Sequence, residues 1–152
     1  MAIRTLILGS IFLLTMGVAS AAEPSPPTPK EAIRKYVDIF NARTLESEIS
    51  AVFDFPLVWV IDGTMKYVES PEPKCFEYAS LLKTGWAYSE VNKLETLSEG
   101  PNTAVVFLNF SRFTDKGTEL LRSDAFYTLI KRGTSWKIAT VSVPSSVPMV
   151  KD

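Results

Sequence analysis

The second half of the sequence is dominated by four strand-like segments joined by short turns. The segments cover roughly residues 86 to 97, 103 to 114, 119 to 131 and 135 to 143. Their separators, EGPN, DKG and KRGT, contain the glycine and asparagine that tight antiparallel connections need. We therefore predict a four-stranded antiparallel meander, so that one large sheet must organise the fold.

Both faces of this predicted sheet are apolar, which constrains what must cover it. In the second segment, Ala104, Val106, Leu108 and Phe110 alternate with Val105, Phe107 and Phe113. In the third segment, Leu121, Ala125, Tyr127 and Leu129 alternate with Arg122, Asp124, Phe126 and Ile130. Short helices alone cannot cover two apolar faces, so we expect the outer face to form a homodimer with a second copy of the chain. The alternative is that the C-terminal tail or a neighbouring strand covers it.

The first half of the chain contains two predicted helices. Thr28, Pro29 and Glu31 have the spacing of an N-terminal capping box with proline at the first helical position, which predicts a helix start. The apolar positions that follow recur at three- and four-residue spacing and predict one buried face: Ile33, Tyr36, Val37 and Phe40. A second short helix is predicted after Thr44, ending before Pro56.

A β-hairpin is predicted around Asp62 and Gly63, because strand-like residues precede and follow this pair. Asp-Gly is typical of two-residue hairpin turns, whose central positions need positive φ. A third helix is predicted next, with an inner stripe of Phe76, Ala79 and Leu82 and with Gly85 at its end.

The N-terminus has the pattern of a secretory signal peptide. Arg4 precedes an uncharged apolar stretch from Leu6 to Val18, and small residues suited to signal cleavage follow it. We therefore expect an exported protein, periplasmic or secreted, with no stable membrane anchor after cleavage; a retained anchor is the alternative. The predicted division is a signal peptide at 1–22, a proline-rich linker at 23–29, one domain at 30–144 and a tail at 145–152.

The composition excludes several kinds of chemistry. The sequence has no histidine, which removes Ser-His-Asp and Cys-His catalytic groups and the usual zinc sites. Cys75 is the single cysteine, so no intramolecular disulfide can form, and we expect it to be a small buried helix residue. The charge after signal cleavage is about −2, without a basic cluster, so nucleic acid is not expected as a partner. We expect no cofactor and no metal.

The order of helix, helix, strand, helix and long antiparallel sheet resembles the SnoaL-like and ketosteroid-isomerase-like domains of the nuclear transport factor 2 superfamily. The supporting stretches are EAIRKYVDIFNARTLESEISAVF, VWVIDG and SDAFYTLIKRGTSWKIATV. The resemblance covers nearly the whole chain after the signal peptide. It implies an α+β fold in which a cone-shaped, curved antiparallel sheet wraps around about three N-terminal helices (a cystatin-like α+β roll). It also implies a pocket between the first helix and the concave face of the sheet.

The resemblance also suggests residue roles. Ketosteroid isomerases use an aspartate base after the first strand, with a tyrosine and a protonated aspartate as oxyanion donors. By motif these would be Asp62 in VIDG, Tyr36 in RKYV and Asp124 in SDAF. Each has another interpretation: Asp62 as a solvated turn residue, Tyr36 as a core tyrosine, and Asp124 as an ion-pair partner of Arg122 and Arg112. We therefore assign no catalytic residue.

The residues expected to line the pocket are Tyr36, Phe40, Trp59, Arg112, Arg122, Asp124 and Phe126. Their aromatic character favours a domain that binds a small apolar ligand in the cone, or a partner through its sheet, rather than an enzyme. The first alternative is an isomerase, cyclase or dehydratase that uses carboxylate acid/base chemistry. The second is a non-catalytic interaction module of the cell envelope.

Overall fold

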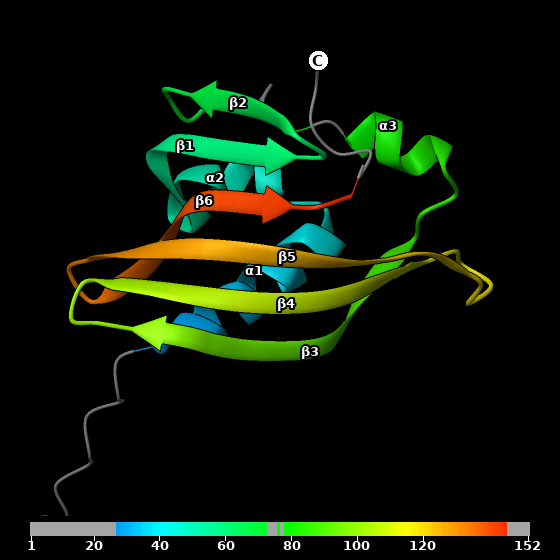
Figure 1. Ribbon diagram of the computed structural model, residues 1–152. Helices are drawn as coiled ribbons and strands as arrows, with labels where there is room; N and C mark the ends of the chain where they lie inside the picture. Colours follow the sequence, from blue (N-terminus) through cyan, green and yellow to red (C-terminus); the bar gives the residue numbers. More distant parts are fainter. Residues whose placement is uncertain (1–26, 73–75, 77, 146–152) are drawn as a thin grey trace, which may run out of the picture.

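A computed structural model describes residues 27–72, 76 and 78–145 (Figure 1). The predicted signal peptide, most of the linker, Cys75 and all but the first residue of the tail lie outside the described residues. The elements are α1 (Pro29–Ala42), α2 (Leu45–Val52), β1 (Phe53–Ile61), β2 (Thr64–Val68), α3 (Tyr78–Lys83), β3 (Tyr88–Glu99), β4 (Thr103–Phe113), β5 (Glu119–Arg132) and β6 (Ser135–Val143).

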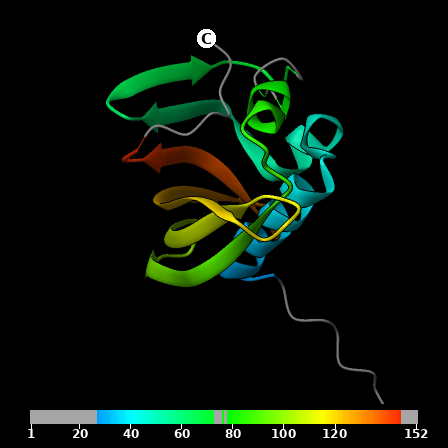
Figure 2. The ribbon, with the colours of Figure 1, turned by 90° about the vertical axis from the view of Figure 1, so that its right-hand side faces the viewer.

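The strands form one sheet in the order β2-β1-β6-β5-β4-β3. The predicted meander of β3 to β6 is confirmed, since these neighbours pair antiparallel. β1 pairs parallel with β6, so the sheet is mixed rather than wholly antiparallel. The helices lie on one side of the sheet, which curves around them (Figure 2). The result is the predicted cone-shaped α+β fold.

Helix α1 begins where the sequence predicts. The Thr28 backbone N–H donates to Glu31 Oε2 at 2.6 Å, and the Glu31 N–H donates to Thr28 Oγ1 at 3.3 Å. This capping box satisfies amide groups that the first turn leaves without partners. The predicted apolar stripe is buried: Ile33, Tyr36, Val37 and Phe40. It packs against the sheet face that bears Leu108, Arg112 and Tyr127, which we call the inner face.

The predicted hairpin is confirmed. Ile61 pairs with Thr64, and the two residues between them have φ values of 48° at Asp62 and 74° at Gly63. Both central residues therefore have the positive φ of a type I′ turn. Both are exposed to solvent.

The predicted inner stripe of the third helix is wrong in part. Phe76 is buried as expected, but Leu81 is 1% exposed, whereas Leu82 is 41% exposed and Ala79 is also exposed. The helix begins only at Tyr78, so spacing counted from Phe76 assigns the wrong helical face. Gly85 follows this helix with a φ of +84°, as expected of a residue that ends it.

The sheet face opposite the helices, which we call the outer face, bears Phe107, Asp124 and Phe126. Phe107 and Phe126 lie with ring centroids 5.3 Å apart, and Phe126 is 37% exposed. Strand β2 adds Tyr67 and Met65, which are 60% and 70% exposed and share this face by strand register. No described helix covers this face (Figure 2).

Candidate functional site

A cavity lies between α1 and the inner face of the sheet. It has an empty volume of about 450 Å³, which includes open space at its boundary. Its interior is narrow, with room for about one or two water molecules between the walls. The lining residues come from α1, β3, β4, β5 and β6: Tyr36, Val37, Phe40, Ser89, Leu108, Phe110, Arg112, Tyr127, Val141 and Val143. The walls are mostly apolar, with four polar side chains among them.

Arg112 places a positive charge in this cavity. The residue is 3% exposed, and its guanidinium carbon lies 5.9 Å from the ring centroid of Phe40 and 5.5 Å from that of Phe110. Burial lowers the pKa of the guanidinium from 12.5 to about 10, and the nearby tyrosine hydroxyls Tyr36 and Tyr127 oppose this change. Because a pKa of about 10 is well above neutral, Arg112 stays charged at pH 7.

Tyr36 and Tyr127 supply neutral hydroxyls. Their ring centroids lie 5.8 Å apart in an edge arrangement, which packs α1 against β5. Burial raises the pKa of both phenols above 10, although the Arg112 charge acts in the opposite direction. Both are therefore protonated at pH 7 and can donate hydrogen bonds, but they cannot act as bases.

Ser89 on β3 is held in place by two other residues. Asn41 of α1 donates through Nδ2 to the Ser89 carbonyl at 2.8 Å and accepts the Ser89 N–H at Oδ1, also at 2.8 Å. Trp86 Nε1 donates to Ser89 Oγ at 3.0 Å. Ser89 is also the direct cross-strand partner of Arg112. Ser89 was not predicted as a site residue from the sequence. Its two-residue spacing from Val91 is the signal that could have placed it on the inner face, but a bulge after Val91 interrupts the alternation.

The structure brings three of the predicted pocket residues together in the cavity: Tyr36, Phe40 and Arg112. Trp59 does not line it. Its ring packs 5.8 Å from Phe53 and 5.3 Å from Phe76 in a separate part of the core, with 1% exposure. Trp59 is therefore a core residue rather than a cavity residue.

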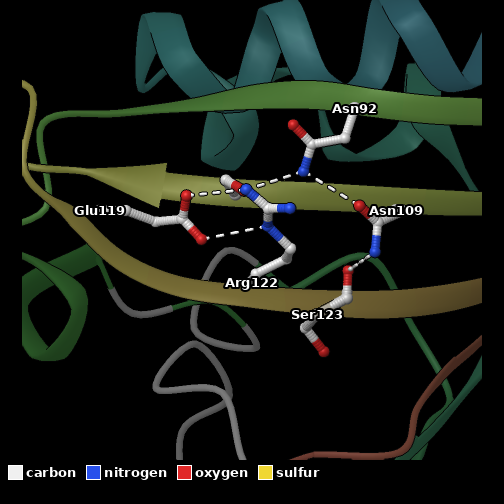
Figure 3. Close-up of polar contacts among 6 residues, drawn as sticks. Asn92, Asn109, Glu119, Arg122 and Ser123 are labelled. Atoms are coloured by element: carbon white, nitrogen blue, oxygen red, sulfur yellow. Dashed lines mark hydrogen bonds and ion pairs between the residues drawn. The ribbon is translucent and has the colours of Figure 1, made fainter.

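The predicted placement of three other residues in the cone is wrong, because they lie on the outer face: Arg122, Asp124 and Phe126. The expected ion pair of Asp124 with Arg122 is also wrong, because Arg122 pairs with Glu119 at 3.0 Å. Asp124 instead accepts a hydrogen bond from Asn109 Nδ2 at 2.7 Å. Figure 3 shows Asn109 within a polar row that also includes Asn92, whose Nδ2 donates to Asn109 Oδ1 at 3.0 Å.

Arg112 cannot pair with Asp124 because the two side chains project from opposite faces. In the strand register, Asp124 lies opposite Asn109, and Arg112 lies opposite Leu121. Positions 109 and 112 differ by an odd number of residues, so their side chains alternate to different sides of the sheet.

The three residues suggested as an isomerase triad are not gathered at one site. Tyr36 is in the cavity, Asp124 is on the outer face, and Asp62 is exposed at the tip of the β1-β2 hairpin. None of the described residues that line the cavity is an aspartate or glutamate. The described part of the chain also has no group of three or more acidic or cysteine side chains that could hold a metal ion. None of its helices has the length and apolar character to cross a membrane.

Comparison with known families agrees with this fold. The model of the family described as NTF2-like protein (DUF6841) matches residues 29–146. The chain belongs to this NTF2-like family. The predicted relationship to the nuclear transport factor 2 superfamily is thereby confirmed. No curated protein sequence matches the chain significantly.

Solved structures share the NTF2-like fold at low sequence identity. A candidate ketosteroid isomerase from Shewanella frigidimarina is 10% identical with a TM-score of 0.57, over 74% of this chain and 90% of that one. A candidate aromatic ring hydroxylase from Novosphingobium aromaticivorans is 10% identical with a TM-score of 0.58, over 78% and 87%. An NTF2-like protein with a cystatin-like fold from the same organism is 16% identical with a TM-score of 0.59, over 75% and 77%. At such identities the likeness establishes the fold alone.

Proposed function

We propose that this protein is an exported domain that binds a small, largely apolar molecule in the cavity between α1 and the inner sheet face. The main support is the cavity lining itself, in which apolar walls surround a few fixed polar groups. Small-molecule sites in proteins commonly have this composition, because apolar contact provides affinity and a few polar groups fix orientation. The signal-peptide pattern of residues 1–22 is the basis for proposing export.

We propose binding rather than catalysis because the described lining offers no general base at neutral pH. The buried tyrosines are protonated, and Arg112 is charged. Carbonyl isomerisation needs a group that removes a proton near the substrate carbonyl. A candidate ketosteroid isomerase shares the fold, so an isomerase, cyclase or dehydratase activity is the alternative. Turnover in a ketosteroid isomerase assay that is lost in Tyr36→Phe would favour that alternative.

A second function, binding of another copy of the chain, is favoured by the outer face. Phe126, Tyr67 and Met65 leave apolar surface on a face that no described helix covers. Exposed apolar surface of this kind is typical of protein interfaces. We propose that the outer face forms a homodimer; an interaction module that binds a different envelope protein is the alternative.

Native mass spectrometry of the mature protein, purified from the periplasm or medium of its own host, tests these proposals together. The expected result is a dimer that carries a co-purified small molecule. Phe126→Lys should convert the dimer to a monomer, because a buried interface disfavours an unpaired charge. The matched control is Leu82→Lys on α3, where an apolar side chain of similar exposure lies away from the outer face. A wild-type protein that is empty and monomeric would contradict both proposals, and recovery of unprocessed chain from the cytoplasm would contradict export.

A further inference from the structure

We propose that the ligand of this cavity is a small organic acid, whose carboxylate pairs with Arg112 and Ser89 while its apolar part contacts the cavity walls. The inference rests on the proposed binding function and specifies its ligand class. Three features of the cavity support it: its charge, the placement of its hydrogen-bond donors, and its dimensions.

The charge of the cavity favours an anion. Of the ten described residues that line it, Arg112 alone carries a formal charge at neutral pH. The other polar side chains are the neutral hydroxyls of Ser89, Tyr36 and Tyr127. An ionic interaction is strong where solvent is excluded, so a ligand that brings a negative charge to Arg112 gains more than a neutral ligand does.

The donors are placed so that one carboxylate can accept from both strands. Ser89 and Arg112 face each other directly across β3 and β4, at a spacing where Cβ atoms are about 4.5 to 5.5 Å apart. Ser89 Oγ already accepts a hydrogen bond from Trp86, which leaves its own proton free to be donated. A carboxylate has two oxygens that can each accept, so it suits a guanidinium next to a hydroxyl.

The guanidinium and the serine are also held in defined positions. Arg112 packs over the rings of Phe40 and Phe110, and Asn41 fixes the backbone of Ser89 from α1. Side chains that are already ordered lose little entropy when a ligand binds. The donor pair is therefore preorganised.

The dimensions restrict the rest of the ligand. The narrow interior has room for a carboxylate but not for a ring, so the apolar group of the ligand must lie in the wider, open part of the cavity; this favours a single ring or a short chain over a steroid-sized molecule. The rings of Phe40 and Phe110 lie next to Arg112, and aliphatic side chains such as Val143 line other parts of the cavity. These surfaces suit an apolar group attached directly to the acid.

The test compares three probes of similar size that differ in charge. Benzoate is the anion, benzamide is its neutral counterpart and benzylammonium is the cation. Binding to the wild-type protein is measured at pH 7 by calorimetric titration, and the site is located by ¹H-¹⁵N shift changes of the Ser89, Arg112 and Tyr127 amides. We expect benzoate to bind about 10- to 100-fold more tightly than benzamide, as a charge-assisted hydrogen bond predicts. Benzylammonium should bind more weakly than benzamide.

Arg112→Met should remove the preference for benzoate while benzamide still binds. The matched control is Arg122→Met on the outer face, which deletes the same charge outside the cavity and should leave the preference unchanged. Arg112→Lys keeps the positive charge but has fewer hydrogen-bond donors, so it should retain a reduced preference for benzoate. If Arg112→Met does not fold, Arg112→Lys serves as the test variant in its place.

The outcomes separate this inference from the proposed function. If benzamide binds in the cavity as tightly as benzoate, or if Arg112→Lys binds the two equally, the assignment of an acidic ligand is overturned while ligand binding stands. If none of the three probes shifts the cavity amides at millimolar concentration, the proposal that this cavity binds small molecules fails as well.

Discussion

Replacing Arg112 by methionine is expected to stabilise the folded protein. Burial lowers the pKa of the guanidinium from 12.5 to about 10, so folding disfavours its charged form relative to its neutral form by about 3 kcal/mol. Methionine has a similar length and an apolar surface, and it removes this penalty. The variant loses the contacts of the guanidinium, those with Phe40 and Phe110 among them, which we take as about 1 to 2 kcal/mol in total. The expected net gain is about 1 to 2 kcal/mol in the free energy of unfolding.

Urea denaturation at pH 7, followed by tryptophan fluorescence and far-UV circular dichroism, measures this gain. With a slope near 1.5 kcal/mol per molar urea, the midpoint should rise by about 1 M. Arg122→Met is the control, because this exposed arginine pairs with Glu119 at the surface and should change stability by less than about 1 kcal/mol. If Arg112→Met is instead less stable than the wild type by more than about 1 kcal/mol, the contacts of the guanidinium outweigh its burial and the reasoning is refuted. A stabilised variant that no longer prefers benzoate would mean that the chain retains a destabilising charge for ligand binding.

Other variants test the remaining assignments. Above pH 10 the tyrosines of the unfolded chain lose their phenolic protons, whereas buried Tyr36 and Tyr127 of the folded chain retain theirs. Each of these two tyrosines therefore lowers the free energy of unfolding by about 1.4 kcal/mol for every pH unit above 10. Tyr127→Phe should therefore make the alkaline decline in stability shallower by that amount, and an unchanged slope would contradict the burial of its hydroxyl. Asp62→Asn should leave stability and ligand binding unchanged, because Asn-Gly suits the same turn, whereas Gly63→Ala at φ +74° should cost about 1 kcal/mol in a thermal melt. Trp59→Ala should destabilise the fold by about 3 to 5 kcal/mol. The affinity of its folded fraction for benzoate should stay within about twofold of the wild-type value. A larger loss would mean that Trp59 does contribute to the binding site.

The parts of the fold that were predicted correctly depend on residues close together in the chain. The Thr28 cap, the Asp62-Gly63 turn and the alternation in β4 and β5 are each specified within a few residues. The helix α3 stripe was predicted less well, because its phase depends on where the helix begins.

The candidate site was predicted only in part, for a different reason. Tyr36, Phe40 and Arg112 lie on stripes that the apolar pattern already identified, and all three line the cavity. Arg122 and Asp124 were correctly assigned to one face of β5, but that face is the outer one. Alternation separates two faces of a strand without saying which of them the helices cover when both carry apolar residues.

The elements, their order and the alternation that separates Arg112 from its neighbours can be predicted from the amino-acid sequence, since these follow from local backbone preferences and side-chain period. The surroundings of each side chain, in contrast, depend on how the elements pack together. Packing of α1 on the inner face buries Arg112 next to Phe40, and the pairing of β3 with β4 places Ser89 opposite it. These contacts join residues tens of positions apart, so strand register and helix docking, rather than any local motif, form the proposed acid-binding site.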